Sequence, residues 1–96
     1  MYRIRILKKA KQDLSNIRDY IALDNPYRAI SFTQEMLTNF SRKISIYPKS
    51  GLKCKDFYYS IYKNYLIFYD IAESEKEIVI LHIVHSSNYT SYQNFI

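Results

Sequence analysis

The chain has 96 residues, the length of one small domain, so we expect a single domain over residues 1–96. Lys and Arg outnumber Asp and Glu by 14 to 9, which gives a net charge of +5. One Cys excludes an intrachain disulfide and a Cys-based zinc cluster, and one Gly excludes the glycine-rich loops that bind phosphates or dinucleotides. We therefore expect no cofactor and no metal ion.

The sequence predicts a chain without a membrane partner. Its longest nearly continuous apolar run, Ile78 to Val84, is far too short to span a bilayer. Met1 to Ala10 contains basic residues, but no apolar stretch of signal-peptide length follows them. We expect a cytoplasmic protein in which Cys54 is reduced.

The first half of the chain predicts a strand followed by two helices. Residues 2–7 alternate between apolar and basic side chains, as in a half-buried or edge strand. Residues 8–23 change to a helical period, and Asp24-Asn25-Pro26 then ends one helix and caps the next. The second helix should end near Ile46, before Pro48. The apolar positions that fall on one face of these helices are Ala10, Leu14, Ile17, Ile21, Ala29, Phe32, Met36, Phe40 and Ile44.

The second half predicts a basic loop and three strands. The loop covers residues 48–56, and the strands cover 57–62, 65–71 and 78–84. Lys63-Asn64 should form a hairpin turn in which Asn tolerates a positive φ, and residues 73–77 form an acidic turn. The order β-α-α-β-β-β predicts an α+β fold, an antiparallel sheet with a helical hairpin on one face. We expect Ile67, Ile80 and Ile83 in its core with the helical stripes.

Basic side chains gather in residues 1–18 and 42–55, and these two stretches suggest a polyanionic or acidic partner. Candidate partner contacts are the basic residues Arg3, Arg5, Lys49, Lys53 and Lys55, together with Tyr65, Tyr69 and His85; the alternative for the basic stretches is an ordinary solvated surface.

Alternation along a strand places Tyr65 and Tyr69 on one sheet face. An open face would stack bases or hold a partner helix, whereas a covered one would pack these rings across strands. His82 and His85 should point to opposite faces, with His82 a core or sheet-face residue and His85 exposed at the strand end. Candidates for acid–base chemistry are His85, Tyr89 and Tyr92.

Five segments together resemble the RelE/ParE superfamily of bacterial toxins, the toxic halves of type II toxin–antitoxin pairs. The segments are Ala10-x-x-Asp13-Leu14-x-x-Ile17-x-x-Tyr20-Ile21, Asn25-Pro26-x-x-Ala29-x-x-Phe32, Ile44-x-x-Tyr47-Pro48-x-x-Gly51, Tyr65-Leu66-Ile67-Phe68-Tyr69 and Ile78-Val79-Ile80-Leu81-x-Ile83-Val84-His85. Their order over most of the chain is more specific than any one of them. The resemblance implies a helical hairpin on a sheet and an antitoxin partner, which we expect to be acidic and to carry an amphipathic helix.

Departures from the family pattern bear on the mechanism. Asp70 stands where ParE-like members usually have Arg, and Ser86-Ser87-Asn88-Tyr89 follows His85 in place of a Gly-Arg-Arg-Asp-like segment. Tyr58, Ser60 and Leu66 stand where RelE-like ribonucleases carry cations, while Tyr92 matches their C-terminal Tyr. Cleavage of RNA builds charge on the phosphate, which Tyr, Ser and Leu do not neutralise.

The resemblance thus leads to two hypotheses. The first is a ParE-like toxin that inhibits DNA gyrase by binding, with residues 85–96 as its contact region. The alternative is a RelE-like, ribosome-dependent mRNA endonuclease with a divergent site, or an inactive homologue. The missing cations favour the first hypothesis and argue against an enzyme.

Overall fold

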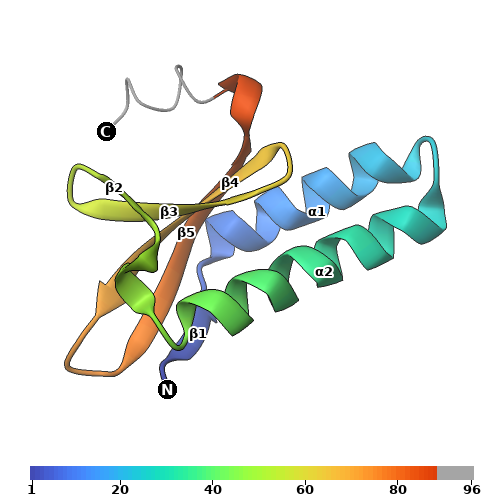
Figure 1. Ribbon diagram of the computed structural model, residues 1–96. Coiled ribbons are helices and arrows are strands. Elements are labelled where there is room, and N and C mark those ends of the chain that lie inside the picture. The colour runs from blue at the N-terminus through green and yellow to red at the C-terminus, as the bar shows by residue number, and fades with distance from the viewer. Residues whose placement is uncertain (89–96) are drawn as a thin grey trace.

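The computed structural model describes residues 1–88 as two helices packed on one face of a five-stranded sheet (Figure 1). The sheet has the strand order β1-β5-β4-β3-β2. The elements are β1 (Arg3–Ile6), α1 (Lys8–Ala22), α2 (Pro26–Ile44), the 3-10 turn η1 (Pro48–Ser50), β2 (Leu52–Cys54), β3 (Phe57–Tyr62), β4 (Tyr65–Ala72), β5 (Glu77–His85) and the 3-10 turn η2 (Ser86–Asn88). The expected α+β fold with a helical hairpin on one face is confirmed.

The strand pairing differs from expectation at both edges of the sheet. β1 runs parallel to β5, so the sheet is mixed, whereas the strands from β2 to β5 are antiparallel. Alternation shows that residues 2–7 form a strand but carries no information about the direction of the neighbour. β2 is a short edge strand within the segment expected to be a loop; two of its three residues are exposed, which weakens the sequence signal.

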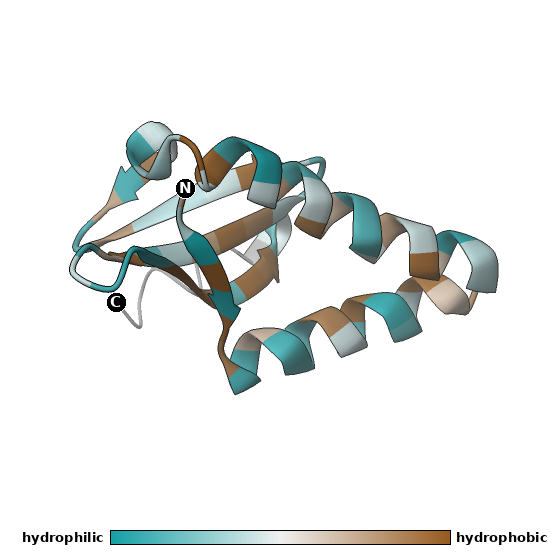
Figure 2. Ribbon diagram, turned by 90° about the horizontal axis from the view of Figure 1, so that it is seen from below, coloured by the Kyte–Doolittle hydropathy of each residue, from teal (hydrophilic) through white to brown (hydrophobic). Residues whose placement is uncertain are grey.

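The cap and the apolar stripes predicted from the sequence are both present in the helices. The Asn25 side chain caps α2 by accepting a hydrogen bond from the Arg28 N–H at 3.0 Å, and Pro26 occupies the first helical position. Figure 2 shows hydrophobic and hydrophilic positions alternating along both helices. Their apolar stripes meet the sheet in one core, which buries Ala10, Ile17, Phe32, Met36, Phe40, Ile44, Ile67, Tyr69, Ile78, Ile80 and Ile83. The expected members Leu14 and Ile21 are partly buried against this core.

A β-bulge sets the faces of β5. Phe68 of β4 pairs with His82, but the next residue, Tyr69, pairs with Ile80, so β5 carries one extra residue at Leu81. Because of this insertion, Ile80 and Ile83 both reach the helix-side core although they lie three residues apart.

The hairpin turn between β3 and β4 lies where it was expected, but its left-handed residue is Lys63, with φ 52°, rather than Asn64. No helix in residues 1–88 is long and apolar enough to cross a membrane.

Candidate functional site

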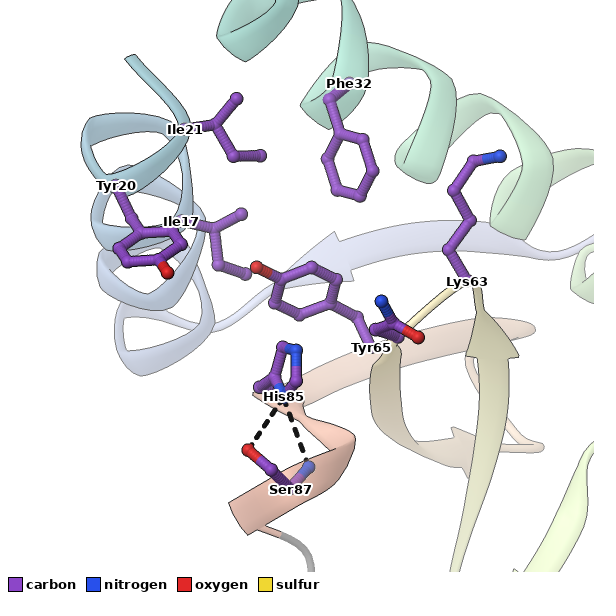
Figure 3. A pocket seen from close by; sticks show the side chains of 9 residues that line it. Ile17, Tyr20, Ile21, Phe32, Lys63, Tyr65, His85 and Ser87 are labelled. Carbon is purple, nitrogen blue, oxygen red and sulfur yellow. Dashed lines mark hydrogen bonds between the residues drawn. The ribbon is translucent and has the colours of Figure 1, made fainter. Parts of the chain in front are cut away.

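A pocket of about 570 Å³ opens between the helical hairpin and the strand ends (Figure 3). Two isoleucines of α1 and the ring of Phe32 from α2 supply apolar walls. Polar groups come from the β3–β4 turn and from the end of β5. The lining residues are Ile17, Tyr20, Ile21, Phe32, Lys63, Asn64, Tyr65, His85 and Ser87.

Aromatic contacts fix the position of Tyr65 in this pocket. Its ring lies edge-on to that of Phe32, at 5.6 Å between centroids, and edge-on to the imidazole of His85, at 5.2 Å. Burial is the main cause that raises the pKa of the Tyr65 phenol, and the nearby Tyr20 phenol adds to it. The Tyr65 hydroxyl is therefore a neutral hydrogen-bonding group at physiological pH.

Ser87 holds the imidazole of His85. The Ser87 N–H donates to His85 Nδ1 at 3.1 Å, and the Ser87 hydroxyl lies 2.8 Å from the same nitrogen (Figure 3). This arrangement leaves Nε2 as the nitrogen that can meet a ligand.

Positive charge is scarce around this imidazole. Lys63 is the only cation among the residues that line the pocket in the described chain. Its ammonium lies 5.8 Å from the Tyr62 ring centroid, and Figure 3 shows the side chain extending away from His85. The pocket thus offers a proton carrier and a single cation that is turned away from it, a weak arrangement for stabilising a developing phosphate charge.

The three positions aligned with ribonuclease cations do not supply that charge. The Tyr58 ring stacks on Tyr69 with centroids 5.6 Å apart, and Ser60 and Leu66 are buried. Ser60 pairs with Ile67 and Leu66 with Ile61 across the β3–β4 ladder.

Two of the candidate partner contacts, Arg3 and Arg5, lie on the edge strand β1. Arg5 Nε donates to the Glu77 carboxylate at 2.8 Å, and an Arg3 guanidinium nitrogen lies 3.4 Å from the Glu75 carbonyl oxygen. Both side chains therefore have acceptors on their own chain.

The other three candidate cations lie on a different surface. Lys49 belongs to η1, Lys53 to β2, and Lys55 to the turn after it, where its φ is 55°. The Lys53 ammonium sits 4.5 Å from the Tyr58 ring centroid, a cation–π contact. The structure does not bring these lysines into the His85 pocket.

Tyr69 shares a sheet face with Tyr65, as alternation predicts, but the helices cover that face. Tyr69 is 0% exposed, which corrects the expectation that its ring is available to a partner. Its hydroxyl donates to the Pro48 carbonyl oxygen at 2.6 Å and accepts from the Gly51 N–H at 3.1 Å. Burial raises the Tyr69 pKa to about 12. Tyr69 thus fastens the segment that carries the lysines to the sheet.

The structure bears on the remaining site candidates unevenly. Tyr89 and Tyr92 lie outside the described residues. The pocket residues Tyr20 and Lys63 were not singled out from the sequence as site residues, because periodicity marks core positions rather than the rim of a cleft. Within residues 1–88, no three His, Cys, Asp or Glu side chains are placed to hold a metal ion.

Three solved structures share the fold of this chain. The chromosomal ParDE toxin–antitoxin system from P. aeruginosa contains a chain that superposes with a TM-score of 0.71 and 21% identity; the match covers 88% of this chain and 96% of that one. The toxin–antitoxin complex RelBE2 from Mycobacterium tuberculosis matches with a TM-score of 0.58, 19% identity and the same coverages of 88% and 96%. A conserved hypothetical protein from Helicobacter pylori matches with a TM-score of 0.55 and 22% identity, over 93% of this chain and 99% of that one.

Comparison by sequence points to one family. No curated protein matches the chain. A family described as the ParE toxin of type II toxin–antitoxin systems, parDE, matches residues 4–89, which is nearly the whole chain. The chain therefore belongs to the ParE toxin family of type II toxin–antitoxin systems.

Proposed function

We propose that this toxin acts in the cytoplasm by binding DNA gyrase and inhibiting it, and that a cognate antitoxin neutralises it. Membership of the ParE toxin family supports a toxin with an antitoxin partner. One observation carries the mechanism: Lys63 is the only cation that lines the pocket in the described chain, and its side chain extends away from the His85 imidazole (Figure 3), which leaves little positive charge to stabilise a phosphate transition state.

The test separates binding to gyrase from cleavage of RNA. The toxin is induced in a bacterial host that carries a DNA-damage reporter, and translated messages are mapped by primer extension. We expect the reporter to rise and the messages to stay intact, and purified toxin should reduce supercoiling by purified gyrase. An unchanged supercoiling rate at saturating toxin would rule out gyrase as the target.

A second candidate is a ribosome-dependent endonuclease. It is favoured by the free Nε2 of His85 in a pocket that also holds the Tyr65 phenol, because this pair can exchange protons. An endonuclease would cleave messenger RNA at fixed codon positions, and this cleavage would disappear in His85→Ala. Matched cleavage by wild type and His85→Ala would leave this pocket without a catalytic role.

The antitoxin should carry an amphipathic helix whose apolar face covers the pocket. The walls are apolar, and Tyr20 at the rim is 72% exposed, so a partner could cover surface that solvent now meets. Acidic side chains of the same partner would approach Arg3 and Arg5, where they mainly speed association.

Two exposed tyrosines of the hairpin make a matched test of this docking. Tyr20 lines the pocket, whereas Tyr27, which is 87% exposed, does not. Tyr20→Glu should weaken the complex with the product of the neighbouring gene by about tenfold or more, a typical effect at a central contact. Tyr27→Glu should leave the affinity within about twofold, since peripheral contacts are nearly neutral. Equal effects of both variants would place the antitoxin elsewhere.

A further inference from the structure

We propose that a basic surface at the end of α2 binds the phosphate backbone of duplex DNA. The basic surface consists of Arg42, Lys43, Lys49, Lys53 and Lys55. The inference rests on the proposed function, because gyrase holds duplex DNA, and it gives the toxin a second contact within that assembly.

None of the five cations of this surface has a carboxylate within 4.0 Å in the described residues, although Glu73 lines the same hollow as Lys49 and Glu35 the same hollow as Arg42. Residues 42–55 contain five cations and no Asp or Glu, and all five cations are exposed. In residues 1–88 the ion pairs within 4.0 Å involve Arg5, Lys9 and Arg28, none of which belongs to the basic surface. Asp56 follows Lys55 in sequence without pairing with it. An external polyanion would supply the missing charge.

The segment that carries the lysines is fastened to the sheet by hydrogen bonds and ring contacts. The buried Tyr69 hydroxyl bonds to Pro48 and Gly51, one on each side of Lys49. The Tyr58 ring, stacked on Tyr69, forms the platform beneath the Lys53 ammonium at 4.5 Å. A surface that is already ordered loses less conformational entropy when it binds.

The composition of the basic surface favours nucleic acid over an acidic protein. Four of its five cations are Lys, a residue depleted from protein–protein interfaces, where Arg is enriched. A Lys ammonium is a compact point charge that suits phosphate without requiring a fixed geometry. Tyr47, 70% exposed between Lys43 and Lys49, adds a hydroxyl that can donate to a phosphate oxygen.

Salt dependence is the sharpest measure of such binding. If each cation neutralises one phosphate of B-DNA, the slope of log affinity against log salt is about −4.5, and affinity falls about 500-fold between about 50 and 200 mM salt. Fluorescence anisotropy with a short labelled DNA duplex measures both quantities on the purified toxin. Removing three cations in Lys49→Gln/Lys53→Gln/Lys55→Gln should reduce the slope to about −1.8 and the loss to about twelvefold.

A matched variant controls for net charge. Lys8→Gln/Lys11→Gln/Lys76→Gln removes the same charge from exposed lysines outside the basic surface. Lys76 resembles the test set closely, since its φ is 52° and its ammonium lies 5.3 Å from the Tyr2 ring centroid. The control should keep the wild-type slope to within about one unit. A control slope that falls as far as that of the loop variant would overturn the proposal, as would a wild-type slope near zero.

Further measurements distinguish DNA from other polyanions and the DNA contact from the proposed function. Single-stranded RNA and polyglutamate replace the duplex in the same assay, and tighter binding of either would overturn the assignment to DNA. Gyrase inhibition without duplex binding would refute the proposed DNA contact of the basic surface but not the proposed function. Duplex binding with no effect on gyrase would refute the proposed function but not the DNA contact of the basic surface.

Discussion

Replacing Asp13 by Ala should destabilise the fold by about 2–3 kcal/mol, because this carboxylate completes the sheet where a strand is missing. β1 ends at Ile6, which pairs with Ile80, but β5 continues to His85. Beyond Ile80, no strand of the described residues 1–88 pairs with the backbone of β5 on that side. Asp13, buried on α1, accepts a hydrogen bond from the Ile83 N–H at 3.0 Å and so takes the place of the missing strand.

The size of this destabilisation follows from the Ile83 N–H that Asp13→Ala leaves without an acceptor. A charge-assisted hydrogen bond contributes about 1.5–3 kcal/mol, and an unpaired buried N–H costs about 1–3 kcal/mol, so the two overlap rather than add. For a domain of this size the expected loss corresponds to a fall in Tm of about 10–20 °C. Asp13→Asn keeps an oxygen that can accept from Ile83, and it should cost about 1 kcal/mol.

Replacing Lys9 tests the ion pair of Asp13 separately from its hydrogen bond to the backbone of β5. Lys9 pairs with the other oxygen of Asp13, but its side chain is 60% exposed, so Lys9→Ala should cost at most about 0.5 kcal/mol. Urea unfolding of the three purified variants, followed by circular dichroism, measures these differences. An Asp13→Ala variant whose free energy of unfolding lies within about 0.5 kcal/mol of wild type would contradict this role of Asp13, as would a Lys9→Ala variant that is equally destabilised.

Three further changes test the packing around the basic segment and β5. Gly51→Ala should destabilise by about 1–3 kcal/mol, seen as a lower Tm, since its Cβ would lie 2.3 Å from the buried Tyr69 hydroxyl and 2.8 Å from the Tyr59 carbonyl oxygen. Tyr69→Phe leaves the Pro48 carbonyl without its donor and should cost about 1–2 kcal/mol in urea unfolding; a neutral result would mean that water replaces the hydroxyl. Burial, followed by the charge of Lys9, lowers the pKa of His82 in the folded chain. As the pH falls, the unfolded chain therefore binds a proton at this imidazole before the folded chain does. The contribution of His82 to the free energy of unfolding is complete above pH 6.5 and is lost as the pH drops below that value. His82→Gln should flatten that part of the stability profile, and an unchanged slope would assign it to another group.

The helices were predictable because their signals are local. Asn25 and Pro26 mark the start of α2 in the sequence, and the cap forms as those residue types require. The apolar stripe that ends at Ile44 reports its buried face directly. By contrast, the parallel partner of β1 depends on contacts between residues more than seventy positions apart, such as Ile4 with Ile78. No local pattern encodes that choice.

The candidate site was predicted only in part. His85 and Tyr65 were singled out, and they do meet in one pocket. Tyr69 looks equivalent to Tyr65 in sequence, since the two lie four residues apart on a strand, yet only Tyr69 lies fully beneath the helices. The difference arises from where the hairpin crosses the sheet, which a strand's own alternation does not determine.

The bulge in β5 explains why His85 reaches the pocket at all. A regular strand that points Ile78 and Ile80 toward the helices would next point residue 82 there, and then residue 84. The extra residue at Leu81 reverses this phase, so that Ile83 enters the core and His85 stands opposite Tyr65. The apolar run from Ile78 to Val84 does not alternate, and it therefore hides this reversal from the sequence. The reversed segment is also the one whose Ile83 N–H is held by Asp13, so one buried carboxylate on α1 stabilises the strand end that presents the imidazole.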